Sequence, residues 1–118
     1  MDFGISDEQS MLRDMAREYL ANRLTSEAVR SLMESERAHD EALWVEMAEM
    51  GWHAMAIPEE YGGLGLSASA YVRVIQEVAS IDASLAVTIG AHQSIGLKGI
   101  LLFGTDEQKK KYLPQLAS

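Results

Sequence analysis

Apolar side chains recur every three or four residues along most of the chain, the spacing of one face of an α-helix. The first such stretch follows Ser6, which with Gln9 fits a capping box, and it predicts a helix over Asp7–Arg23. Its apolar positions are Leu12, Met15, Ala16, Tyr19 and Leu20.

Residues that suit helix N-caps, and glycines that suit helix ends, divide the rest of the chain into five further helices. These are a short helix capped by Ser26 with Val29, Leu32 and Met33 inward, a helix from Asp40 to Gly51, one from Ser67 or Ser69 to about Asp82 with Val72, Ile75, Val78 and Ala79 on one side, one over about Ala83–Phe103, and one from a Thr105–Gln108 capping box to about Pro114. No strand is predicted, so the expected fold is an all-α bundle of about six helices in one domain, residues 1–118.

Composition supports a folded domain and narrows the partners. The 118 residues are 47% hydrophobic and 24% charged, which is ordinary globular usage. Ten basic residues against 18 acidic ones give a net charge of −8, which opposes binding to nucleic acid. The basic run Lys109–Lys111 is interpreted as the solvated face of a helix.

Targeting and metal signals are missing from the sequence. There is no cysteine, and His92 has no carboxylate or histidine at metal-ligand spacing, so no metal site is predicted and His92 is expected to be structural. The first fifteen residues resemble neither a signal nor a transit peptide, which predicts a cytoplasmic protein, or a mitochondrial-matrix one if it is a mature eukaryotic protein. Polar residues from Thr88 to Lys98 interrupt the most apolar stretch, so no membrane span is predicted.

The stretch PEEYGGLGLS, residues 58–67, raises the question of a phosphate-binding loop. Its glycine spacing matches no nucleotide fingerprint, no strand precedes it, and Glu59 and Glu60 place negative charge where an anion would lie. We therefore predict a tight connection in which the glycines satisfy backbone geometry while Tyr61, Leu64 and Leu66 pack inward. Glu59 and Glu60 are expected to be solvated rather than catalytic, and Trp44 and Trp52 to be packing anchors.

Three glycines, at positions 90, 96 and 99, fall inside the helix predicted over Ala83–Phe103. Each costs about 1 kcal/mol relative to alanine, which suggests that something approaches the helix closely. One stripe of the helix, starting at Ala83 and Val87, has small side chains in its first half, and Gly96 and Gly99 lie on the opposite side, where a second helix is expected. From the residues alone, the small stripe either packs in the core or forms a narrow apolar trough.

The segments WHAMAIPEEYGGLGLS, residues 52–67, and GAHQSIGLKGILLFGTDEQKKKYLPQLAS, residues 90–118, closely resemble the amino-terminal helical domain of acyl-CoA dehydrogenases. The likeness extends to the SDEQ start and is strongest to the very-long-chain and long-chain members. That family has helical, β-barrel-like and helical domains in this order. The resemblance implies that this sequence is the first domain, with the β-domain and the carboxy-terminal helical domain absent.

The resemblance also implies a role for the small stripe, because family members line the fatty acyl pocket with this helix. Carried over by position, the substrate-binding residues are Val87, Thr88, Gly90, Ala91 and Ser94, and small residues at 90 and 91 imply a deep pocket for a medium to long chain. The family uses FAD to desaturate fatty acyl-CoA in β-oxidation, passes electrons to electron-transfer flavoprotein and forms homo-oligomers. Since the flavin-holding domain and the catalytic base lie outside this sequence, the chain alone is expected to hold no FAD and to be inactive.

Two other functions remain open at this stage. One is a free-standing helical module that binds a lipid or a partner helix without catalysis. The other is the same domain from an acyl-CoA oxidase or a flavin-dependent monooxygenase, in which residues elsewhere decide the reactivity toward oxygen.

Overall fold

A computed structural model describes residues 5–118, and within that range every regular element is a helix or a helical turn. The elements are α1 Asp7–Arg23, α2 Ser26–Glu34, α3 Glu41–Glu49, η1 Trp52–Ala54, η2 Glu59–Tyr61, α4 Ala68–Ile81, α5 Ala83–Ala91, η3 His92–Leu97, α6 Lys98–Phe103 and α7 Asp106–Ala117. The all-α prediction is confirmed, and the predicted fifth helix is present as the continuous series α5, η3 and α6.

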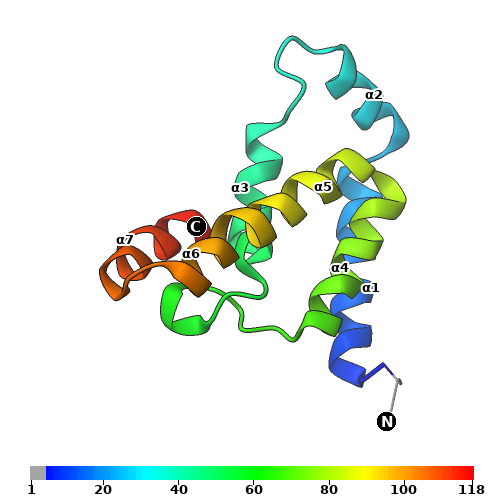
Figure 1. Ribbon diagram of the computed structural model, residues 1–118. Coiled ribbons are helices and arrows are strands. Elements are labelled where there is room, and N and C mark those ends of the chain that lie inside the picture. The colour runs from blue at the N-terminus through cyan, green and yellow to red at the C-terminus, as the bar shows by residue number, and fades with distance from the viewer. Residues whose placement is uncertain (1–4) are drawn as a thin grey trace.

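This continuous helix joins two hydrophobic cores. In Figure 1, α1 and α4 stand side by side, and α5 and α6 run from their upper end across the molecule to α7. The larger core lies between α1, α3, α4 and α5 and contains Leu20, Met47, Val78 and Ile89. The smaller core lies where η1, η3 and α7 meet. One helix therefore fixes the position of each core relative to the other.

Most predicted helix caps are confirmed. Asp40 accepts hydrogen bonds from the N–H groups of Ala42 and Leu43, Ser67 caps α4, and Thr105 and Gln108 form the complete capping box. Two details differ. The N-cap of α2 is Thr25 rather than Ser26, and the amide of Gln9 donates to Ser69 Oγ at 3.1 Å, which ties α1 to α4 instead of closing a capping box.

The buried faces of two helices were predicted wrongly. In α4 the buried positions are Ala70, Val74 and Val78, whereas Val72 and Ala79 are exposed. In α2 no residue is fully buried, and Met33 is 75% exposed. Both helices are apolar on more than one side, so the spacing of apolar residues alone could not select the side that faces the core.

A polar network holds α3 against α1. The Arg23 guanidinium donates to Glu46 at 2.9 Å and to Asp40 at 2.8 Å, and the Tyr19 hydroxyl donates to Glu46 at 2.6 Å. The N–H of Leu43 and the charge of Arg23 lower the pKa of Asp40 below its ordinary value. The N-cap of α3 is therefore also an anchor for α1.

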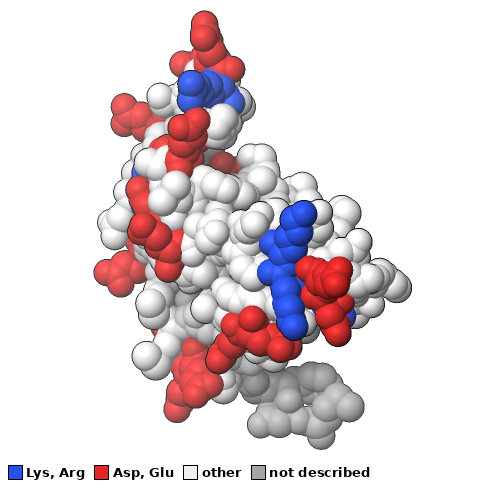
Figure 2. Space-filling view, turned by 90° about the vertical axis from the view of Figure 1, so that its left-hand side faces the viewer, with Lys and Arg blue, Asp and Glu red and all other residues white. Residues whose placement is uncertain are grey.

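Charged side chains lie mainly away from the long helix. Figure 2 shows acidic side chains spread along the top and left edge of one face, and one compact group of basic side chains beside acidic ones. Wide uncharged areas separate them. The net charge of −8 is thus distributed over the surface of this face rather than gathered at one site.

The glycine-rich connection is built from two short 3₁₀ turns, η1 and η2, which the sequence did not predict. Gly62 and Gly65 have φ values of 87° and 61°, as expected for positions where other residues are strained. Gly63 has a different constraint, because a Cβ there would lie 2.1 Å from the carbonyl oxygen of Ile57. Leu64 is more exposed than predicted, although its side chain covers Gly51.

A cluster of aromatic rings links the two cores. His53 of η1 is 1% exposed, its ring centroid lies 4.0 Å from that of Trp44, and its Nε2 has no hydrogen-bond partner. The His92 ring lies 5.5 Å away, and His92 Nε2 is 2.8 Å from the carbonyl oxygen of Leu116 in α7. The structural role predicted for His92 is confirmed, since its ring fastens η3 to the last turn of α7.

Substitution of two glycines by alanine should have opposite effects on stability. Gly63→Ala should lower the free energy of unfolding by more than about 3 kcal/mol, because its Cβ collides with backbone oxygens that cannot move independently. Gly99→Ala should raise it by up to about 1 kcal/mol, because nothing lies within 4 Å of that position. Urea unfolding of both variants measures this. Equal losses would contradict the steric account.

Protonation of His53 should destabilise the fold in mildly acidic solution. Burial, with a smaller contribution from His92, lowers the pKa of His53 from 6.5 to about 4, so the folded protein binds fewer protons than the unfolded chain between these values. Stability is therefore complete above pH 6.5 and falls as the pH decreases toward 4. Allowing for partial access of water, we expect a loss of about 2 kcal/mol.

The matched variant is His53→Phe, which keeps an aromatic ring against Trp44 but binds no proton. Its unfolding free energy should stay constant between pH 6.5 and 5, above the range in which the carboxylates titrate. If the wild type and His53→Phe lose stability in parallel over this interval, His53 is not the responsible group.

Candidate functional site

The outer face of α5 and η3 is open to solvent although it is largely apolar. Val87 is 70% exposed, Thr88, Ser94 and Ile95 are exposed, and Ala91 is half-buried. None of these side chains carries a charge, so this face offers hydrocarbon and hydroxyl groups to whatever contacts it.

The hydropathy of this helix is unusual for its exposure. Ala83–Phe103 spans 21 residues with a mean hydropathy of 1.3, long and apolar enough to cross a membrane by length and composition, and 22% of its most apolar window is buried. One such helix is weak evidence for a membrane span, because a core helix passes the same test. At the far end of the helix, Phe103 is 88% exposed.

One flank of the helix faces α4. A Cβ at Gly90 would lie 3.6 Å from the hydroxyl oxygen of Tyr71, so the space beside Gly90 is bounded by this ring. A hollow of about 160 Å³ continues along the same flank and reaches Ser94 and Lys98. Burial raises the pKa of Tyr71 above its ordinary value, which keeps its hydroxyl protonated.

The other flank faces α3. Thr88 lines a hollow of about 140 Å³ together with Trp44, Leu85 and His39. The Thr88 hydroxyl donates to the carbonyl oxygen of Ser84 at 2.9 Å, which leaves its methyl group and lone pairs available.

The five predicted pocket residues therefore lie on one helix but not at one cavity. Val87 and Ala91 lie on the outer face, Gly90 and Ser94 turn toward α4, and Thr88 turns toward α3. The trough predicted beside Gly90 is partly occupied by Tyr71, whereas the face at Val87 is uncovered.

Gln93 positions this helix, and the sequence reasoning missed it. It is buried, its Nε2 donates to the carbonyl oxygen of Trp52 at 2.8 Å, and its Oε1 accepts from the N–H of Ala56 at 3.3 Å. Its amide thus fastens η3, a π-helical turn, to the chain between η1 and η2. A detectable signal was present, because Ala86, Ile89, Gln93 and Leu97 follow the spacing of a buried face with one polar member.

The predicted helix contact at Gly96 and Gly99 is wrong. Gly96 is exposed, its nearest neighbour being the Ala91 carbonyl oxygen at 4.0 Å, and nothing lies within 4 Å of Gly99. The neighbouring α7 contacts the helix through the buried side of η3, at Leu97, and not through these glycines.

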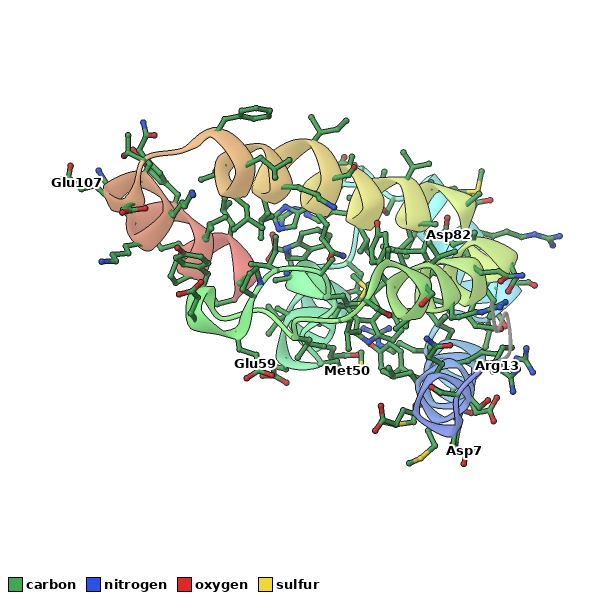
Figure 3. All side chains as sticks on the ribbon, turned by 60° about the horizontal axis from the view of Figure 1, so that its bottom comes forward. Asp7, Arg13, Met50, Glu59, Asp82 and Glu107 are labelled. Atoms are coloured by element: carbon green, nitrogen blue, oxygen red, sulfur yellow. The ribbon has the colours of Figure 1, made fainter. Side chains whose placement is uncertain are left out.

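Catalytic groups do not accompany the outer face within residues 5–118. The side chain of Glu59 points away from the helices, as Figure 3 shows, and Glu60 is likewise exposed on η2. Within the same range, no three metal-binding side chains are grouped together. The described arrangement can bind an apolar chain along a helix but offers no acid–base pair beside it.

Comparison with known proteins assigns this architecture to one family. A family model described as the N-terminal domain of acyl-CoA dehydrogenase matches residues 6–118. The human mitochondrial very long-chain specific acyl-CoA dehydrogenase is 49% identical over 79 residues, which cover 67% of this chain and 12% of the human protein.

Bacterial relatives match over nearly the whole chain. The acyl-CoA dehydrogenase of Bacillus subtilis is 35% identical over 114 residues, covering 97% of this chain and 30% of that protein. The solved structure of a Bacillus anthracis acyl-CoA dehydrogenase complexed with FAD has a TM-score of 0.84 and 36% identity, covering 95% of this chain and 19% of that one. The chain thus spans less than a third of the length of each of these proteins.

Proposed function

The chain belongs to the acyl-CoA dehydrogenase family as its N-terminal domain, and we propose that it forms one wall of the fatty acyl pocket in an FAD-dependent acyl-CoA dehydrogenase. The observation that supports this most directly is the open, uncharged outer face at Val87, Thr88, Ala91 and Ser94. An apolar helix with this much exposed surface is stable in water only at a cost, so a function that covers it is expected.

The proposed substrate is a medium- to long-chain fatty acyl-CoA. The outer face contacts a chain through methyl and methylene groups, and each buried methylene contributes about 0.8 kcal/mol before ordering costs. The absence of a charged side chain from Val87 to Ser94 favours a hydrocarbon tail over a polar one. Gly90 contributes less than its size implies, because Tyr71 already lies against it.

FAD, when bound in such an enzyme, supplies the hydride acceptor for α,β-desaturation. We place its binding site and the catalytic base in the domains that this chain lacks, and give this domain the tasks of holding the tail and excluding water from it. Electron-transfer flavoprotein as the acceptor and a homo-oligomeric assembly complete the proposal, and both rest on the family alone. An acyl-CoA oxidase remains the second candidate within the same architecture.

Narrowing the outer face should change the chain-length preference of a full-length enzyme that contains this domain. Val87→Trp adds bulk where the wild-type side chain is 70% exposed, so the domain's own packing is undisturbed. Loss of room for about two methylenes should lower kcat/KM for hexadecanoyl-CoA by more than about tenfold. The value for butanoyl-CoA should stay within about twofold, as measured with an artificial electron acceptor.

The control is Val72→Trp, which places the same bulk on the exposed side of α4. It should leave both substrates unaffected. Equal losses for long and short chains with Val87→Trp, or the same profile with Val72→Trp, would contradict the assignment of this face to the acyl tail.

The 118-residue chain should purify without flavin. Absorbance between 370 and 450 nm, roughly the flavin region, should be below about a tenth of a stoichiometric FAD complex after incubation with excess FAD and desalting. A yellow protein close to one FAD per chain would show that this domain itself holds the cofactor.

A further inference from the structure

We propose that the hollow between α4 and η3, named here the Tyr71 slot, binds a short-chain aliphatic carboxylate, with its tail inside and its carboxylate at Lys98. The slot is defined by Ile57, Leu66, Tyr71, Ser94 and Lys98. It is separate from the outer face to which the acyl tail is assigned, so this inference does not depend on the proposed function.

The walls of the slot are apolar and fit a small aliphatic tail. Ala56, Ile57, Leu66 and Ala68 supply hydrocarbon on the side of the glycine-rich connection and the start of α4. The volume of about 160 Å³ corresponds to about five groups of the size of a water molecule. A tail of about four or five carbons therefore fits, whereas a long fatty tail does not.

The polar groups of the slot are mostly donors without a protein partner. The Tyr71 hydroxyl makes no hydrogen bond among the described residues, and neither does the Lys98 ammonium, which also forms no ion pair there. Ser94 donates its proton to the carbonyl oxygen of Gly90 at 2.6 Å, so toward the slot it offers only lone pairs. The amide of Gln93 is engaged with Trp52 and Ala56 and serves as part of the wall.

This inventory selects the ligand. Two free donors, one of them cationic, match the two oxygens of a carboxylate, and charge-assisted hydrogen bonds of this kind are the stronger ones. An amine would leave both donors unsatisfied and would meet a like charge at Lys98. An alcohol would satisfy one donor without the charge. The order of affinity expected is carboxylate, then alcohol, then amine.

The test is a titration of the ¹⁵N-labelled 118-residue protein with sodium hexanoate at constant ionic strength, followed by amide chemical shifts. Shifts should concentrate at Leu66, Tyr71 and Ser94 and saturate with a Kd of about 1 to 10 mM. Hexan-1-ol should bind about tenfold more weakly and hexylamine should produce no saturable shift at these residues.

Two variants with a matched control assign the donors. Lys98→Met should weaken hexanoate about tenfold and leave hexanol unchanged, and Tyr71→Phe, which keeps the ring, should weaken both by about threefold. Lys110→Met removes the same charge from exposed α7 and should leave binding unchanged.

Three results would overturn the proposal. These are equal binding of hexanoate and hexanol, shifts that saturate at another groove, and equal weakening by Lys98→Met and Lys110→Met. Each is read from binding alone, so it bears on the Tyr71 slot independently of the chain-length assay for the outer face.

Discussion

The hydrogen bonds of one buried amide hold the functional half of this domain in place. Gln93 binds the backbone at both Trp52 and Ala56, and those two residues bracket the η1 turn. A buried amide is favourable only when its donor and acceptor are both satisfied, so the π-helical turn and the connection are constrained together. Leu97, one turn further along, completes the smaller core. The position of the long helix relative to the glycine-rich connection follows from this pair of bonds.

The consequence is a helix with two different sides. Its inner side contributes Ile89 to the larger core and Leu97 to the smaller one, and both are fully buried. Its outer side presents Val87 and Ile95 to solvent with no cover from residues 5–118. Hydropathy along the sequence averages the two sides, which explains why the segment reaches the mean hydropathy of a membrane-spanning helix while its outer side is a surface. In the family architecture, the outer side is the one available to substrate.

The glycine-rich connection acts through shape rather than chemistry. Gly62 and Gly65 provide left-handed backbone angles, and Gly63 provides the space in which the chain crosses the carbonyl oxygen of Ile57. With side chains removed at these points, Leu66 returns to the larger core and α4 begins beside α1. This path brings Tyr71 against Gly90, so the same connection that resembles a phosphate loop in composition instead forms one side of an apolar slot.

Much of the secondary structure could be predicted from the sequence because the causes are local. Asp40, Ser67 and Thr105 cap helices through N–H groups two or three residues away, and Gly51 ends α3 through its own backbone freedom. The resemblance carried by residues 52–67 and 90–118 likewise needed only the order of residues, and the family match confirms it.

Other features depended on tertiary structure. The choice of Val74 over Val72 as the buried residue of α4, the steric requirement at Gly63 and the solvation of Gly99 all depend on which distant atoms are nearby. The pairing of Gln93 with a backbone segment about 40 positions earlier depends on the same information. The sequence determined the helices and the family, whereas the packing decided which sides of those helices are covered, because burial is set by the sum of non-local contacts and not by the spacing of apolar residues within one helix.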